Sequence, residues 1–237
     1  MRSEVVIITA CWQRPAVFRF FCQWYTQLQP RPVIVCAGSP GDCCEEIASE
    51  FGVVYEQVEN VMGPKWNHAC QMASKVRARY YLFMGSDDVM DRGMWSFYQE
   101  FNGQHLGLLD LFFYERASRS MAYWPGYKDA RRKGEPIGAC KLVSREVMDA
   151  LQWAPFPDDR PNALDFDMHN RILALGVQPT VLPMGQAGGI AVDVKDAGSL
   201  TAFGRIMAQS GVRYVKAPNM ERQSPELWNA LLCIPRH

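Results

Sequence analysis

The stretch Arg79-Tyr-Tyr-Leu-Phe-Met-Gly-Ser-Asp-Asp-Val-Met-Asp91 decides the fold that we expect for this chain. Its apolar run, 80–84, does not alternate with polar residues, which is typical of a strand covered by helices on both faces. The run ends at Gly85, and two aspartates follow closely. Because ligands of parallel sheets bind beyond the carboxyl ends of the strands, we expect Asp87 and Asp88 to lie at a binding site.

Two neighbouring carboxylates repel each other, so the pair costs stability unless a cation lies beside it. Hard oxygen ligands favour Mg²⁺ or Mn²⁺. The pair therefore predicts a metal site that also receives a phosphate-bearing ligand. The alternative is a solvated turn ahead of a helix, with Asp88 or Asp91 as the N-cap residue.

Strands and helices alternate along residues 4–101. The acidic strand should be preceded by strands at 4–11, 33–36 and 52–56. The segments between and after the strands predict helices at 15–28, 43–51, 68–76 and 93–101. Such alternation favours right-handed crossovers and a parallel sheet flanked by helices.

The second part of the chain is less regular. We expect one long apolar strand at 106–114, followed by a polar, basic and aromatic loop or hairpin at 115–137. The other expected elements are strands at 138–143, 177–183 and 188–195, helices at 144–153 and 165–175, and a helical tail at 197–237. The predicted fold is a single α/β domain with a mixed, mostly parallel sheet and a C-terminal helical extension.

Composition narrows the function classes. The 237 residues, 48% of them hydrophobic, suit one globular domain. The formal net charge is zero, so nucleic acid could be bound only through a local patch, for which the candidates are Lys128, Arg131, Arg132 and Lys133. The first apolar run, 5–8, is too short for a signal peptide, and no run approaches the ~20 residues of a membrane span, so we expect a cytoplasmic protein.

Eight cysteines are scattered along the chain without a repeated metal-ligand spacing. In apolar surroundings, such cysteines are expected to be reduced and mostly buried thiols. Adjacent Cys43 and Cys44 could oxidise or bind metal, but no nearby Cys–His set completes a zinc site in the sequence.

Five segments, taken in order, resemble the family 2-like glycosyltransferases of the GT-A fold. They are Thr9-Ala-Cys-Trp-Gln-Arg-Pro15, Lys65-Trp-Asn67, Gly85-Ser-Asp-Asp88, Gly138-Ala-Cys-Lys-Leu-Val-Ser-Arg-Glu146 and Asp165-Phe-Asp-Met-His-Asn-Arg171. The resemblance implies a GT-A domain over residues 1–195, with a nucleotide-binding half at about 1–101 and an acceptor half at about 102–195, followed by an extension at 196–237. So short an enzyme would suit a phage or a bacterium.

The resemblance also implies which residues bind the nucleotide sugar. They would be Cys11, Trp12, Arg14, Gly38, Lys65, Asn67, Ser86, Asp87, Gly138 and Ala139. Asp87 and Asp88 match the family's DxD-type element, in which one carboxylate holds the metal that bridges the diphosphate. Structural alternatives stay open, because Trp12 could be a core aromatic and Gly138 a plain strand start.

The general base would be Asp165 or Asp167, of which Asp165 matches the family better by register. Alternatively, Asp165 caps its helix and Asp167 pairs with Arg171 at i,i+4. Asp193 is the nearest candidate for a third metal ligand, since the family's late histidine has no counterpart.

Two further departures from the family concern the donor. The acid that usually ends the second strand and holds the nucleobase is replaced by Cys36-Ala37. Gly85 replaces the first acid of the commonest metal-binding pattern.

Taken together, the resemblance implies a metal-dependent, inverting transfer of a sugar from a nucleotide-sugar donor to an acceptor hydroxyl. A saccharide, a lipid-linked sugar or a hydroxymethylated base in DNA could be the acceptor, with segment 115–133 as its contact. Two other classes are open. A nucleotidyltransferase normally has a glycine-rich basic loop after its first strand, unlike Ala10-Cys-Trp-Gln-Arg-Pro15, and a non-catalytic nucleotide-sugar binding module would keep the aspartate pair without turnover.

Overall fold

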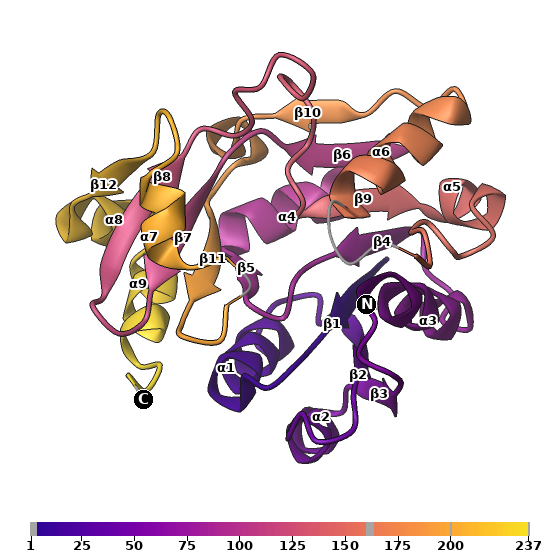
Figure 1. Ribbon diagram of the computed structural model, residues 1–237, viewed down its shortest axis with the longest axis horizontal. Coiled ribbons are helices and arrows are strands. Elements are labelled where there is room, and N and C mark those ends of the chain that lie inside the picture. Colours follow the sequence, from indigo (N-terminus) through magenta and orange to yellow (C-terminus); the bar gives the residue numbers. More distant parts are fainter. Residues whose placement is uncertain (1–3, 160–163, 200, 237) are drawn as a thin grey trace.

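The computed structural model describes residues 4–159, 164–199 and 201–236. Its larger sheet has seven strands in the order β10-β6-β9-β4-β1-β2-β3 (Figure 1). Their bounds are β1 (Val5–Ala10), β2 (Val33–Gly38), β3 (Val54–Gln57), β4 (Tyr80–Phe83), β6 (His105–Leu108), β9 (Lys141–Ser144) and β10 (Thr180–Leu182). Strand β9 runs antiparallel to β4 and β6, whereas the other pairs are parallel. The sheet is therefore mixed and mostly parallel, as expected.

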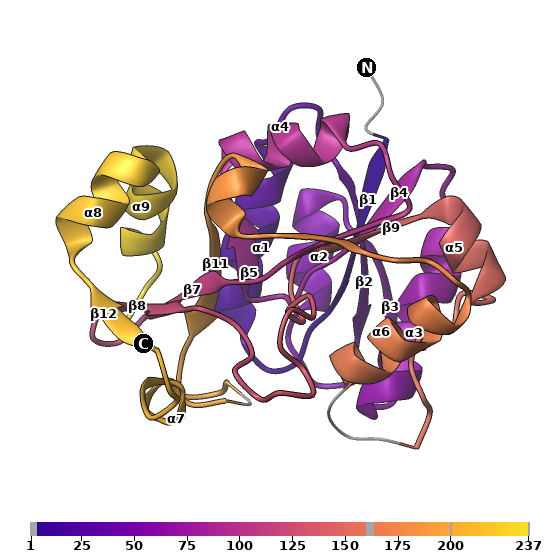
Figure 2. The same cartoon turned by 90° about the horizontal axis from the view of Figure 1, so that it is seen from above.

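Helices cover both faces of this sheet. On one face lie α1 (Pro15–Thr26), α2 (Glu45–Phe51) and α4 (Arg92–Glu100), and on the other α3 (Met62–Ser74), α5 (Arg145–Ala150) and α6 (Leu164–Ala174). Figure 2 shows α3, α5 and α6 together on one side. Alternate residues of β4 enter the two cores: Tyr80 and Leu82 the first, Tyr81 and Phe83 the second. Burial on both faces explains the unbroken apolar run.

A smaller, five-stranded sheet adjoins the larger one, in the order β12-β8-β7-β11-β5. Its strands are β5 (Asp88–Met90), β7 (Leu111–Glu115), β8 (Ser120–Trp124), β11 (Ala191–Lys195) and β12 (Arg213–Val215). The single strand expected at 106–114 is wrong, because the chain passes from β6 to β7 through Leu109 and Asp110. The buried Asp110 carboxylate accepts hydrogen bonds from Met184 N at 2.7 Å and Tyr123 OH at 2.6 Å, which anchors the change of sheet.

Helix α3 begins at Met62 rather than at the expected His68. Pro64 lies in its first turn, where a missing N–H costs no helical hydrogen bond. A Cβ at Gly63 would lie 1.9 Å from the carbonyl oxygen of Pro157, so this glycine lets the helix start against that loop. Lys65 and Asn67 therefore lie on the helix and not in the segment before it.

The tail contains α7 (Phe203–Met207), α8 (Ala217–Gln223) and α9 (Pro225–Leu232), and also β12, a strand that the sequence did not predict. Strand β12 pairs antiparallel with β8. Helix α9 buries Leu227, Trp228 and Leu231, and the Trp228 ring meets Tyr114 at 6.2 Å. The tail is thus packed on the smaller sheet. No helix within the described ranges is long and apolar enough to cross a membrane.

Candidate functional site

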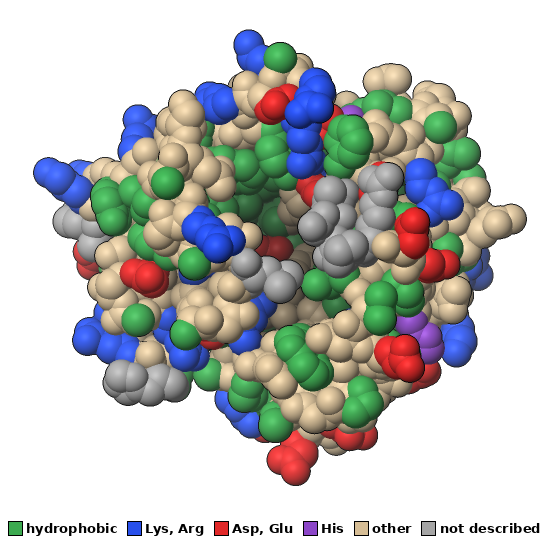
Figure 3. All heavy atoms as spheres, in the orientation of Figure 1, with side chains coloured by type: hydrophobic (Ala, Val, Ile, Leu, Met, Phe, Trp, Pro, Cys, Tyr) green, Lys and Arg blue, Asp and Glu red, His purple; other side chains and the backbone are tan. Residues whose placement is uncertain are grey.

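A pocket of about 300 Å³ lies beyond the end of β4, where the two sheets meet. Its lining includes Asp88, Asp193, Gly138 and Asp165, and we term it the central pocket. Figure 3 shows this face of the molecule hollowed near its middle, with acidic side chains inside and Lys or Arg side chains at the rim. Acidic groups from the smaller sheet and from α6 therefore share one pocket.

Three carboxylates form what we term the acid corner: Asp87, Asp88 and Asp193, whose oxygens lie within 4.8 Å of one another. Asp88 and Asp193 are directly opposite each other in the antiparallel β5–β11 pair, where like charges are destabilising. Asp193 Oδ1 is buried and has no hydrogen-bond partner among the described residues. An orphaned carboxylate oxygen beside two further carboxylates is a donor set that fits Mg²⁺ or Mn²⁺.

Two cations, one partly buried and one buried, adjoin the acid corner. Arg14 Nη1 donates to Asp87 Oδ2 at 2.8 Å, and its side chain is 15% exposed. Lys195 Nζ lies 2.7 Å from Asp193 Oδ2, and its side chain is 9% exposed. With all five groups ionised, three carboxylates against two cations leave one net negative charge. One divalent cation would reverse that sign, which suits an anionic ligand.

The acids of the corner differ in pKa. Burial and the neighbouring charges of Asp193 and Asp87 raise the pKa of Asp88 well above its usual range. Burial, partly offset by Lys195, raises the pKa of Asp193 to about 7. Burial opposes ionisation of Asp87 too, but Arg14 and Lys195 outweigh it and lower the pKa of that carboxyl. Without a bound cation, the corner therefore tends to retain a proton.

The turn before β5 is built for this crowding. Gly85 N donates to Asp88 Oδ2 at 2.7 Å. A Cβ at position 85 would lie 2.6 Å from Asp87 Oδ1 and 2.7 Å from Asp88 Oδ2. A side chain at position 85 would force these carboxylates apart, so the glycine lets them lie close together. Ser86 is buried inside the turn.

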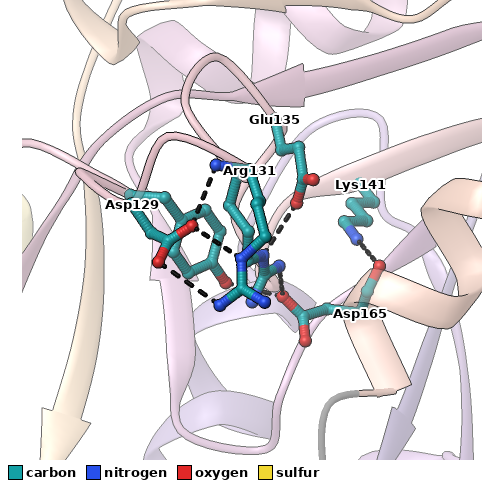
Figure 4. A network of polar contacts seen from close by, with 7 residues as sticks. Asp129, Arg131, Glu135, Lys141 and Asp165 are labelled. Atoms are coloured by element: carbon teal, nitrogen blue, oxygen red, sulfur yellow. Dashed lines mark hydrogen bonds and ion pairs between the residues drawn. The ribbon is translucent and has the colours of Figure 1, made fainter.

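Asp165, at the start of α6, is held in what we term the Asp165 clasp, with Tyr127 and Arg132. Its Oδ2 accepts hydrogen bonds from Tyr127 OH and from Arg132 Nη2, both at 2.6 Å. The guanidinium of Arg132 also lies 3.6 Å from the centre of the Tyr127 ring and donates to Glu135 at 2.8 Å. Lys141 Nζ donates to the backbone oxygen of Asp165 at 2.8 Å, as Figure 4 shows. Loop and helix are thereby tied together at one carboxylate.

The clasp keeps Asp165 ionised. Burial favours the neutral acid, but the charge of Lys141 and the hydrogen bonds from Tyr127 and Arg132 outweigh it, so the pKa of Asp165 is lowered. Burial lowers the pKa of Lys141 itself to about 8. A carboxylate in this state can accept a proton once its partners yield an oxygen.

Of the other residues expected near the donor sugar and the acceptor, some line the central pocket and one does not. Gly138 and Ala139 line the central pocket beside Asp165, and a Cβ at Gly138 would meet Asp165 Cβ at 3.6 Å. Asp167 is on the same helix but not in the pocket lining. Of the two candidate bases, the structure places only Asp165 in the central pocket.

The end of β1 lies to one side of the pocket. Lys65 is buried, and its Nζ donates to the backbone oxygen of Cys11 at 2.5 Å and to Asn60 Oδ1 at 3.2 Å. The same Nζ lies 5.5 Å from the centre of the Trp12 ring, which is 36% exposed and so is not a core aromatic. Lys65 is thus engaged within the protein, while Trp12 is accessible.

Two more of the expected donor-binding residues make internal contacts. Asn67 exchanges hydrogen bonds with the backbone of Phe156, at 2.8 and 3.1 Å, and so fixes the loop after α5. A Cβ at Gly38 would lie 1.9 Å from Tyr55 OH and 2.4 Å from Asp42 Oδ2. Gly38 makes room for a tyrosine and an aspartate, and neither Asn67 nor Gly38 lines the central pocket.

A second pocket of about 320 Å³ adjoins the central one, and we term it the tail pocket. Both pockets share Phe113, Trp124 and Asp193, and the two rings lie 5.9 Å apart. Lys128 lines the tail pocket, whereas Arg131 pairs with Asp129 at 3.2 Å (Figure 4). With Arg132 in the clasp, the expected basic patch is divided among separate contacts.

Three members of the site were missed by sequence reasoning: Lys195, Tyr127 and Arg132. Lys195 had a signal, since residues two apart on a strand share a face and Asp193 was already a candidate. The other two lie in an irregular loop, where the spacing of residues in the sequence does not predict which way a side chain points. Their approach to Asp165 is set by the tertiary fold alone.

Comparisons with known proteins agree on the fold. No protein-family model matches the sequence, and no curated protein matches it. The structure of the inositol-1-phosphate CTP transferase from T. maritima matches 88% of this chain and 98% of its own, with a TM-score of 0.54 and 11% identity. S. aureus TarS matches 82% of this chain, which spans 37% of TarS, with a TM-score of 0.54 and 14% identity.

The likeness is one of fold. It confirms a mixed α/β domain with a mostly parallel sheet flanked by helices, like that of nucleotide-using enzymes. The expected membership of the family 2-like glycosyltransferases stays a prediction.

Proposed function

We propose that this protein is a metal-dependent glycosyltransferase that moves a sugar from a nucleotide-sugar donor to an acceptor hydroxyl with inversion. One observation carries the proposal: two of the three carboxylates of the acid corner, Asp88 and Asp193, line the same pocket as the ionised, partly accessible carboxylate of Asp165. Transfer of a sugar needs charge compensation at the leaving diphosphate and a base at the acceptor. The two acidic groups supply these separate needs.

Asp87, Asp88 and Asp193 would hold Mn²⁺ or Mg²⁺, which would supply positive charge for the leaving diphosphate. Arg14 and Lys195 add two fixed cations beside it. Asp165 would take the proton of the acceptor hydroxyl, and a single base without a covalent intermediate gives inversion. Gly138 and Ala139, next to Asp165, leave room for the donor sugar.

The rings of Phe113 and Trp124, between the two pockets, offer apolar faces on which a sugar or a base can stack. We infer that the acceptor enters from the tail pocket, because that pocket shares Asp193 with the central pocket and is also lined by Tyr127, a partner of Asp165. A saccharide and a hydroxymethylated base in DNA both present the hydroxyl that this arrangement requires.

Nucleotidyl transfer is the second candidate. The match to an inositol-1-phosphate CTP transferase, over 98% of that chain, favours it. Against it, only residues 11–14 separate β1 from α1. This short connection contains no glycine, and its one cation, Arg14, is already paired with Asp87.

A thermal-shift screen separates the candidates, because a ligand that binds the native state raises the melting temperature. Nucleoside diphosphates, their sugar conjugates and nucleoside triphosphates are compared with and without Mn²⁺. Stabilisation by a nucleotide sugar that requires Mn²⁺ supports sugar transfer. Preference for a triphosphate supports nucleotidyl transfer, and donor binding without any transfer or hydrolysis would leave a non-catalytic binding module.

A further inference from the structure

A second cluster of metal-ligating side chains lies away from the central pocket. Cys11 follows β1, Cys36 lies in β2, Cys44 precedes α2, and Asp42 lies in the loop between β2 and α2. All four are buried, with at most 3% exposed. Cys43 is exposed and lies outside the cluster. The cysteines near Cys44 are instead Cys11 and Cys36, which are not adjacent to it in sequence.

The spacing of three of these groups suits one small ion, and Cys36 lies next to one of the three. The ligand atoms of Cys11, Asp42 and Cys44 lie within 4.8 Å of one another. Cys11 Sγ lies 3.3 Å from Asp42 Oδ2 and 3.6 Å from Cys36 Sγ. In a tetrahedral site with zinc–sulfur bonds of about 2.3 Å, two sulfurs lie about 3.8 Å apart. The Cys11–Cys36 pair already has nearly that separation.

The carboxylate of Asp42 is held in place by neighbours. Its oxygens accept hydrogen bonds from Ser39 N at 2.7 Å, Cys44 N at 2.9 Å and Tyr55 OH at 2.9 Å. Such outer partners orient metal-binding carboxylates. Within the described ranges Asp42 forms no ion pair, which is unusual for a carboxylate that is 1% exposed.

The positive charge of Lys65 lies close to the cluster and would reduce the electrostatic repulsion among several anionic ligands. Lys65 is buried, and its Nζ donates to the backbone oxygen of Cys11. Three thiolates and one carboxylate against Zn²⁺ and Lys65 would leave one net negative charge. Sulfur ligands distinguish this cluster from the all-oxygen acid corner, which suits harder cations.

We propose that Cys11, Cys44 and Asp42 form a site for a single zinc ion, completed by Cys36 beside Cys11, and that the ion fastens the ends of β1 and β2 to the start of α2. On binding, each thiol releases its proton to solvent, and a sulfur–zinc bond replaces the S–H bond. No electrons are transferred. The site is independent of the proposed transferase activity.

The test uses Co²⁺ as a spectroscopic probe with the full-length chain, in reducing and metal-free buffer. One equivalent of Co²⁺ should produce thiolate-to-cobalt charge-transfer absorption, which Zn²⁺ then removes by displacement. Cys44→Ala should abolish the absorption and weaken zinc binding at least roughly 10–100-fold. Cys70→Ala removes a buried thiol of α3 and should leave both unchanged, as should Asp88→Asn, which alters only the acid corner.

Three results would overturn the proposal. They are an absorption that survives in Cys44→Ala, one lost equally in Cys70→Ala, or no charge transfer in the wild-type chain. Because Cys44→Ala could fail to fold, wild-type crystals soaked in zinc give a second measurement. Anomalous density between the sulfurs of Cys11 and Cys44 supports the site, whereas a Cys11–Cys36 disulfide without density there excludes it.

Discussion

Asp88 and Asp193 of the acid corner and Asp165 of the clasp line the same central pocket, but the electrostatics of the corner and the clasp are opposite. In the corner, three carboxylates share two cations, and the pKa values of Asp88 and Asp193 are raised. In the clasp, one carboxylate has an arginine, a phenol and a nearby lysine, and its pKa is lowered. The corner has an excess of negative charge, whereas around the clasp Arg132 and Lys141 balance the carboxylates of Asp165 and Glu135.

This difference assigns separate tasks to similar side chains. A group of acids that retains a proton gains stability by exchanging that proton for a metal ion. The ionised carboxylate of Asp165 is already compensated by Arg132 and Tyr127, but it can accept a proton when a substrate hydroxyl replaces one of these hydrogen-bond donors. In the proposed reaction, Tyr127 or Arg132 must therefore release an oxygen of Asp165 before this carboxylate can accept a proton. The acid corner must bind a metal ion.

The largest expected effect comes from removing the base. Asp165→Asn keeps an oxygen that can accept the hydrogen bond of Tyr127 but cannot take up a proton, so turnover should fall roughly 10²–10⁴-fold. Donor binding should persist, measured as the Mn²⁺-dependent thermal shift with the donor. Asp167→Asn, on the same helix outside the pocket, should lose less. A normal rate for Asp165→Asn would rule out this base.

Removing a metal ligand should cost about as much turnover but by another route. Asp88→Asn should lower the rate roughly 10²–10³-fold, the scale seen when one electrostatic stabiliser is lost. Unlike Asp165→Asn, it should also abolish the Mn²⁺-dependent thermal shift with donor, and Asp87→Asn should act in the same direction. Asp149→Asn, an exposed carboxylate on α5, is the matched control. A full thermal shift in Asp88→Asn would exclude a metal role for the corner.

The sequence predicted most of the acid corner, whose aspartates lie in or next to strands. Apolar run 80–84 fixed β4, and the strand rule then put Asp87 and Asp88 at the sheet's carboxyl edge. Asp193 was a candidate only through the family resemblance, and its position opposite Asp88 depends on an antiparallel pairing that sequence spacing does not encode. The break at Asp110 was missed because polar partners distant in sequence, Tyr123 and Met184, stabilise it.

The Asp165 clasp depends on a loop, which contributes Tyr127 and Arg132. The sequence predicted a loop or hairpin at 115–137 with 115–133 in contact with the acceptor. Because this segment has no periodic pattern, the sequence did not predict that Arg132 would reach Asp165. Lys65 is a residue for which the sequence predicted a ligand contact and the structure shows an internal one. Lys65 was expected to bind the nucleotide sugar, yet it lies on α3 with its Nζ donating to the backbone oxygen of Cys11.

A smaller effect should follow from loosening the clasp. Arg132→Gln removes a cation from Asp165, so the pKa of this carboxyl should rise and the acidic limb of the kcat/KM profile should move to higher pH. The rate at acidic pH should then fall several-fold, with less change above neutrality. Tyr127→Phe should shift the limb less. Arg131→Gln, which alters an exposed arginine paired with Asp129, should leave the profile in place; an equal shift there would mean that general surface charge is responsible.

The smallest effect concerns the metal-free protein. The folded state raises the pKa of Asp88, so this carboxyl favours folding most at acidic pH, and that contribution is lost as pH rises above its unfolded value of about 3.8. Asp88→Asn retains an acceptor for Gly85 N without the charge. In EDTA, its melting temperature should therefore exceed that of the wild type by about 2–4 °C at pH 8, corresponding to about 1 kcal/mol, and the gap should close towards pH 4. Mn²⁺ should reverse the order by stabilising only the wild type. A gap that is constant with pH would show that Asp88 carries no charge-dependent strain, and the contrast between corner and clasp would then have to come from Asp193 alone.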